Sequence, residues 1–200
     1  FALMLSIMLI FPFSLSSWLC AAVASLTWRL SMPPAQRKTK HAYVSLLLFA
    51  LAIREPSAQF FLQIMAEQVL ALDAQLAFLL LDTFTDQVSL QNNIIVNEEG
   101  TNLIILTGCS AFGNLSLALL LYISLALYWS NKLVIKDAYK MILLVILVLI
   151  CNSSRLALMT LSDETYTFVH DGLGASLFDL TILILPVAVL LLPLTTRGKV

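Results

Sequence analysis

Long runs of apolar residues separated by short polar segments dominate the sequence. Crossing about 30 Å of hydrocarbon takes roughly 20 apolar residues at 1.5 Å each in a helix. Four stretches are long enough, namely residues 1–28, 109–129, 141–161 and 173–193. We expect each of them to be a membrane-spanning helix.

A fifth apolar stretch, from His41 to Ile53, is short for a span and is closely followed by Pro56. Proline lacks the N–H donor of a helix interior and its ring clashes with the preceding turn, so it predicts a break in the helix. We interpret residues 41–54 as a short crossing and residues 57–83 as a separate helix.

Charged residues indicate which segments face the cytoplasm, because cytoplasmic loops retain Lys and Arg. The basic residues gather in 29–40, in 129–140 and in the C-terminal tail: Arg29, Arg37, Lys38, Lys40, Lys132, Lys136, Lys140, Arg197 and Lys199. Segments 82–108 and 162–172 contain acids and no Lys or Arg: Asp82, Asp86, Glu98, Glu99, Asp163, Glu164 and Asp171. The first group is predicted to be cytoplasmic and the second extracytoplasmic.

This orientation requires an odd number of crossings between residues 40 and 84, so 41–54 and 57–83 cannot both span. The second helix carries a polar stripe at Gln59, Gln63, Glu67, Gln75 and Asp82. Such an amphipathic helix fits the outer membrane interface or the wall of a wet cavity. The alternative is an ordinary crossing with its polar face inside a bundle.

Two β-prone runs, 93–96 and 101–106, flank a turn at 97–100 that contains Gly100. They predict a β-hairpin whose end leads directly to Cys109. The predicted fold class is thus an all-α polytopic membrane protein of about five transmembrane helices, one interfacial amphipathic helix and a small outer β-hairpin. We expect a single integral membrane domain over residues 1–200.

Composition supports the membrane assignment. The chain is 60% hydrophobic and only 12% charged, so it cannot surround a core with a polar shell. A net charge of −1 argues against nucleic acid as a partner. The opening segment is too long and too weakly charged for a cleavable signal peptide, and we interpret it as a span of the mature protein.

The three cysteines, Cys20, Cys109 and Cys151, lie far from one another and from either histidine. Their spacing fits neither a disulfide framework nor a zinc site, so no metal and no cofactor is predicted. Cys20 and Cys151 lie well inside spans, where cysteine is usually an apolar filler. Cys109 lies at the outer start of a span, where free N–H groups and the helix dipole favour a reactive thiolate.

Arg155 lies within a predicted span, where an unpaired arginine costs at least about 2.5 kcal/mol. Counting from Met141, it lies roughly 21 Å along the helix, in the outer third of the bilayer. It could extend to the outer headgroups, but Asn152, one turn earlier, adds a second polar group on the same face and favours a polar site.

His170 follows in the last outer loop, at the predicted depth of Cys109 and Arg155. A thiol, an imidazole and a guanidinium supply a nucleophile, a proton carrier and an oxyanion clamp for acyl transfer. Asp179, about two turns into the last span, could orient His170 or neutralise Arg155, and Asp171 is the alternative partner of the histidine.

The chain resembles the exosortase/archaeosortase family over about residues 41–190. Family members carry an Ala-Cys-Ser-Gly type motif, then Asn-x-x-Arg, then His-x-x-x-Gly on successive membrane helices. The counterparts here are Gly108-Cys109-Ser110-Ala111, Asn152 to Arg155 and His170 to Gly174. Ala111 departs from the family's glycine.

The resemblance implies a membrane cysteine protease or transpeptidase in the plasma (inner) membrane, with its active site facing the extracytoplasmic side. Such an enzyme cuts a C-terminal sorting signal of exported, membrane-anchored proteins through a thioester. It implies Cys109, Arg155 and His170 as catalytic residues, with Asn152, Asp179, Ser110 and Gly174 in support. Many members are also linked to exopolysaccharide machinery.

Two alternatives remain. The chain could be a non-catalytic subunit or scaffold of an exopolysaccharide synthesis or export system, in which Arg155 and His170 bind a glycan, a lipid phosphate or a partner helix. It could also be a small transporter that uses Arg155 and Asp179, although the sequence contains no duplicated half and no pair of broken helices.

Overall fold

The structure, a computed structural model, describes residues 15–34, 36, 40–85, 87–98, 101–130 and 133–193. Several residues used above lie outside the described part of the chain: 1–14 of the first predicted span, Arg37, Lys38, Asp86, Glu99, Gly100, Lys132, Arg197 and Lys199. The chain divides into two compact units, one from 1–64 and 123–133 and the other from 65–122 and 134–200.

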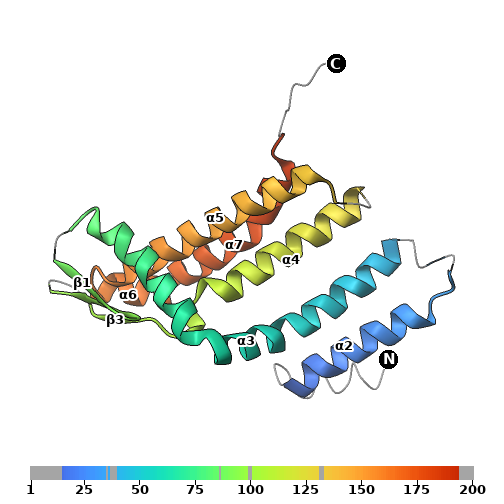
Figure 1. The fold of residues 1–200 in the computed structure, drawn as a ribbon, viewed down its shortest axis with the longest axis horizontal. Coiled ribbons are helices and arrows are strands. Elements are labelled where there is room, and N and C mark those ends of the chain that lie inside the picture. The colour runs from blue at the N-terminus through green and yellow to red at the C-terminus, as the bar shows by residue number, and fades with distance from the viewer. Residues whose placement is uncertain are drawn as a thin grey trace. The chain divides into compact units, whose positions relative to one another are not determined.

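The helices confirm most of the predicted spans (Figure 1). Helix α2 is Leu15–Ser31, α3 is Lys40–Asp82, α4 is Ala111–Ser130, α5 is Ile135–Met159, α6 is Asp163–His170 and α7 is Leu173–Leu191. Among the described residues, four helices are long and apolar enough to cross a membrane, and these are Ala42–Asp82 within α3, α4, α5 and α7.

The predicted helix break at Pro56 is wrong. Helix α3 continues through this proline, and its non-helical residue is Met65, with φ −113° and ψ 16°. A proline costs a helix one hydrogen bond and a local clash, and neighbouring turns can absorb both where apolar residues favour a helix on either side. The five residues of the predicted polar stripe are all exposed.

A small antiparallel sheet precedes Cys109. It comprises β1, Val88–Gln91, β2, Ile94–Asn97, and β3, Leu103–Ile104, in the order β1-β2-β3. The β2–β3 pair confirms the predicted hairpin, with Ile94 opposite Ile104. Strand β1 was not predicted, and it pairs with β2 across a turn at Asn92, a residue with φ 58° that asparagine tolerates better than most side chains.

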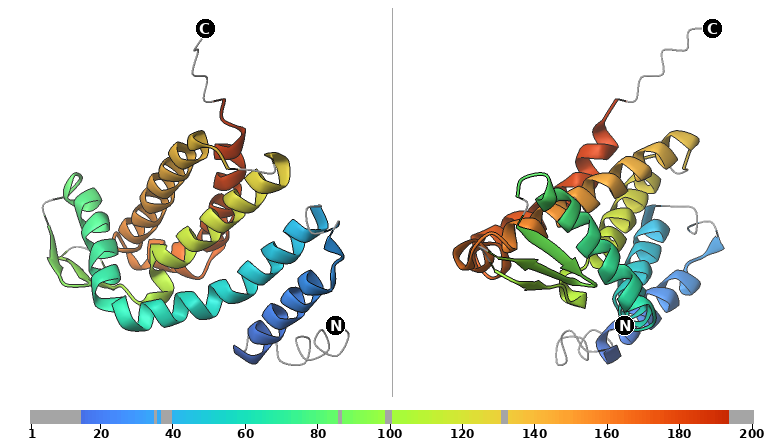
Figure 2. Two further views of the ribbon diagram at one scale, coloured as in Figure 1. Left: turned by 45° about the vertical axis from the view of Figure 1, so that its right-hand side comes forward. Right: turned by 60° about the vertical axis from the view of Figure 1, so that its left-hand side comes forward.

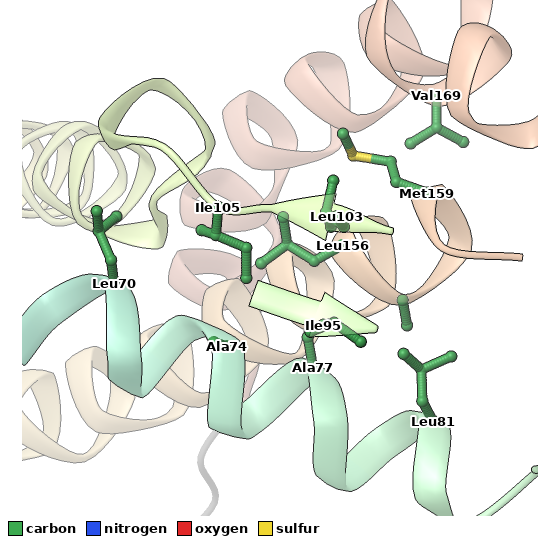
Figure 3. Close-up of a cluster of buried hydrophobic side chains, with 11 residues drawn as sticks. Leu70, Ala74, Ala77, Leu81, Ile95, Leu103, Ile105, Leu156, Met159 and Val169 are labelled. Atoms are coloured by element: carbon green, nitrogen blue, oxygen red, sulfur yellow. The ribbon is translucent and has the colours of Figure 1, made fainter. Parts of the chain in front are cut away.

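The second unit has a hydrophobic core. Four parts of the chain enclose it: the C-terminal half of α3, the sheet, the C-terminal end of α5, and α6. Its buried members are Leu70, Ala74, Ala77, Leu81, Ile95, Leu103, Ile105, Leu156, Ala157, Met159 and Val169 (Figure 3). Figure 2 shows the sheet and α6 at the same end of α5. This core fixes the ends of the elements that carry the predicted site.

Hydrogen bonds join the sheet to the turn between α5 and α6. The buried Asn97 side chain donates to the Thr160 carbonyl at 2.8 Å, and the Thr101 N–H donates to the same oxygen at 3.1 Å. The Thr101 hydroxyl also donates to Asp163 at 2.7 Å. The chain that leads to Cys109 is therefore tied to the segment that leads to His170.

Candidate functional site

Cys109 ends a short 3₁₀ turn, η2, Thr107–Cys109, immediately before α4. Its N–H donates to the Leu106 carbonyl at 2.9 Å, and its side chain is partly buried against the core described above. Ser110 is buried, 4% exposed, and its hydroxyl accepts the Phe112 N–H at 3.2 Å. All three cysteines are unpaired thiols.

Asn152 connects α5 to the Cys109 turn. This asparagine is only 3% exposed, and its side-chain amide donates to the Cys109 carbonyl at 3.2 Å. A buried amide group requires such a partner because leaving it unpaired would cost about 1–3 kcal/mol. The bond brings the second predicted motif, on α5, into direct contact with the first.

Arg155 lies one turn beyond Asn152 on α5 and is partly buried. Its Nε is buried without a hydrogen-bond partner, and within the described ranges its guanidinium makes no hydrogen bond or ion pair. Burying an unpaired cation is costly, so the arrangement favours an anion or a polarised oxygen at this position. Asp179, predicted as a possible neutralising partner, is exposed on α7 and makes no described ion pair.

His170 is the last residue of α6, a helix that occupies the predicted last outer loop. Ser162 caps this helix by accepting the Thr165 N–H at 3.2 Å. The His170 ring stacks on Tyr166, with centroids 5.1 Å apart, and its Nδ1 lies 2.7 Å from Asp171 Oδ1. A carboxylate at Nδ1 favours the tautomer with its proton there, which leaves Nε2 able to accept a proton.

Gly174 lies in the first turn of α7 and is buried. A Cβ added to it would lie 2.8 Å from the Phe168 carbonyl oxygen, closer than real Cβ contacts allow. Gly172 faces the same oxygen at the same distance. The glycine of the predicted third motif therefore permits α7 to start close against the end of α6, which carries His170.

Asp73 is a site residue that was not predicted from the sequence. It lies on α3, is 4% exposed, and its Oδ2 accepts the Ala111 N–H at 3.1 Å. Its carboxylate also interacts with the Ser110 side chain. Free N–H groups were expected at the start of α4, and for Ala111 and Phe112 this expectation is wrong: Asp73 accepts the first N–H and Ser110 accepts the second.

The geometry joins the predicted residues only in part. Asn152 contacts the Cys109 turn, and Cys109 and Tyr166 pack against the same core. In the part of the chain that the structure describes, no hydrogen bond or ion pair links the side chains of Cys109, Arg155 and His170. The arrangement provides a partly buried thiol, an unpaired guanidinium and an oriented imidazole on three adjoining elements of one unit.

Comparison with known families decides the assignment. The family model described as transmembrane exosortase (Exosortase_EpsH) matches residues 1–188, nearly the whole chain. The chain belongs to the transmembrane exosortase family. No curated protein and no solved structure matches it.

This exosortase is accordingly a multi-pass membrane protein, because its family and the four candidate spans within the described ranges agree. The motifs that first indicated the family lie at the Cys109 turn, on α5 and at the junction of α6 and α7. Exosortases are generally transpeptidases that act on proteins with sorting signals.

Proposed function

We propose that this exosortase is a cysteine protease or transpeptidase that cleaves the C-terminal sorting signal of exported, membrane-anchored proteins near the extracytoplasmic face. The observation that carries the proposal is the bond of 3.2 Å from the Asn152 amide to the Cys109 carbonyl. It holds the Asn-x-x-Arg motif against the turn that presents the thiol. The unpaired Arg155 guanidinium and the Asp171-bound His170 ring support the same assignment.

In this proposal the Cys109 thiolate attacks the scissile carbonyl, and His170 accepts the proton of the thiol. Arg155 stabilises the oxyanion of the tetrahedral intermediate, the form in which charge on the carbonyl oxygen is greatest. Collapse breaks the peptide C–N bond, and the leaving amine takes a proton from His170. The thioester is then resolved by an amine acceptor or by water, with His170 accepting the proton of the nucleophile.

The experiment compares cells that carry wild-type protein, Cys109→Ala, Arg155→Ala or Cys151→Ala. Mass spectrometry of the membrane fraction measures C-terminal peptides of exported proteins that end in a transmembrane helix and a basic tail. We expect such uncleaved termini to accumulate at least about tenfold in Cys109→Ala and in Arg155→Ala, because the first variant lacks the nucleophile and the second lacks the oxyanion donor. Cys151→Ala is the matched control and should resemble wild type.

The scaffold alternative predicts a different pattern. If Cys109→Ala leaves cleavage and any exopolysaccharide phenotype at wild-type level while Arg155→Ala abolishes them, the enzyme proposal is wrong. Immunoblots of the membrane fraction establish that each variant is present at equal abundance.

A further inference from the structure

Asp73 lies on the buried face of α3, whereas a solvated acid would lie on the exposed face. The buried face of the C-terminal half of α3 is formed by Leu70, Asp73, Ala74, Ala77 and Leu81. The acids and amides of the polar stripe lie on the exposed side, as Glu67 and Gln75 show. A carboxyl group among apolar side chains is costly unless hydrogen bonds offset its lost hydration. Asp73 therefore requires donors at its position in the core.

The Ala111 N–H supplies one such donor, which Asp73 Oδ2 accepts at 3.1 Å. The side chain of Ser110, the residue directly after Cys109, also interacts with this carboxylate. Ala111 is the first residue of α4, so its N–H has no acceptor within the helix. A negative group there also lies at the positive end of the helix dipole.

The Cys109 turn is consequently held from two helices. Asn152 on α5 binds the Cys109 carbonyl, and Asp73 on α3 binds the Ala111 N–H two residues after it. Both anchors are buried, at 3% and 4% exposure. Neither forms a hydrogen bond with the thiol itself, so both act on the backbone from which the thiol projects.

We infer that Asp73 is a positioning residue for Cys109, fixing the turn between η2 and α4 so that the thiol projects in one direction. The inference rests on the proposed function in so far as Cys109 is the nucleophile. Small errors in the placement of a nucleophile lower the rate strongly, because attack needs an aligned approach at about 3–3.5 Å. A carboxyl group serves here because its oxygen can accept the Ala111 N–H, which has no partner within α4.

The test uses thiol alkylation, which needs no substrate. Cys20 and Cys151 are replaced by Ser in the full-length protein, and the rate at which iodoacetamide modifies Cys109 is measured across pH. The rate at the alkaline plateau, where ionisation no longer limits the reaction, reports how firmly the turn is held. The variants are Asp73→Asn, which keeps an acceptor oxygen, and Asp73→Leu, which has a similar size and no acceptor. Glu67→Ala removes an exposed acid from the same half of α3 and is the control.

We expect Asp73→Leu to raise the plateau rate by roughly threefold or more, since a lost buried anchor lets the turn open. Asp73→Asn should restore a rate within about twofold of wild type, because its oxygen can still accept the Ala111 N–H. Glu67→Ala should leave the rate unchanged. If Asp73→Leu does not fold, Asp73→Asn is compared with Asp73→Ala instead.

The inference is overturned if removing the acceptor leaves the plateau rate unchanged, or if the Asn variant reacts as fast as the variants without an acceptor. Either result leaves the proposed function standing, because cleavage through Cys109 is judged from the membrane proteome. Conversely, the alkylation rates retain their meaning if cleavage does not depend on Cys109.

Discussion

Gly174 provides a sharp test of how α7 packs against the helix that carries His170. In a Gly174→Ala variant the new Cβ would lie 2.8 Å from the Phe168 carbonyl oxygen and 2.9 Å from two carbons of the Phe168 ring. The ring is half exposed and can turn aside. The carbonyl oxygen belongs to the main chain of α6, two residues before His170, and can move only with that helix.

Two effects of opposite sign decide the outcome. Alanine favours a helix over glycine by about 1 kcal/mol, which would stabilise the first turn of α7. The overlap with a backbone oxygen forces a shift that costs about 1–3 kcal/mol, as overpacking in a tight site generally does. The overlap therefore outweighs the gain in helix propensity, and Gly174→Ala should be destabilising by up to about 2 kcal/mol.

The assay is thermal unfolding of the purified protein in detergent, with Gly113→Ala as the matched control. Gly113 lies in the first turn of α4, and a Cβ there would meet nothing within 4 Å. Gly113→Ala should therefore raise the midpoint by a few degrees, since only helix propensity changes, while Gly174→Ala lowers it. A midpoint for Gly174→Ala equal to or above that of the control would refute the close packing described here.

Further outcomes follow from other contacts. Tyr122→Phe removes a buried hydroxyl that donates to Asp137 at 2.7 Å, and should cost about 1–3 kcal/mol in the same assay, whereas the exposed Tyr139→Phe should change stability by less than about 0.5 kcal/mol. The predicted topology can be tested with an impermeant maleimide, because positions 36 and 98 are both exposed. The reagent should label Glu98→Cys on intact cells and Gln36→Cys only after permeabilisation, since the first position is predicted to be extracytoplasmic and the second cytoplasmic. The reverse pattern would place the Cys109 turn in the cytoplasm.

Much of the fold could be predicted because apolar runs of helical length leave few alternatives in a bilayer. Helices α4, α5 and α7 begin and end within a few residues of the predicted spans, apart from the start of α5 at Ile135. The β2–β3 hairpin was also evident from its β-prone residues and turn. These features depend on local sequence, and the pattern of apolar and polar residues along the chain reports only local sequence.

The failures have physical causes. Pro56 does not break α3, because the sequence on both sides favours a helix strongly enough to absorb one lost hydrogen bond. Helix α6 was missed although Ser162 and Thr165 form a capping signal, because eight residues are too few to show a helical period. Strand β1 is short and half exposed, and its existence depends on pairing with β2.

The site was only partly predictable for a similar reason. Motif order singled out Cys109, Asn152 and His170, and Asp171 was named as one of two possible partners of His170, but the contacts of the Cys109 turn with Asn152 and Asp73 were not predicted. Asp171 rather than Asp179 bonds to His170, which depends on how α6 ends, and Asp73 is an isolated acid whose role depends on a contact 38 positions along the chain. Sequence spacing does not reveal such tertiary contacts.

The central claim is that Cys109 is an acylated nucleophile. The most direct measurement is mass spectrometry of the Cys109 peptide from protein purified from its native membrane, with and without hydroxylamine treatment. We predict a hydroxylamine-sensitive adduct on Cys109 of the wild-type protein that is absent in Arg155→Ala and in His170→Ala, because both residues act in the step that forms the thioester. A Cys109 peptide that is unmodified in every variant, in cells whose exported proteins are still cleaved, would contradict the claim.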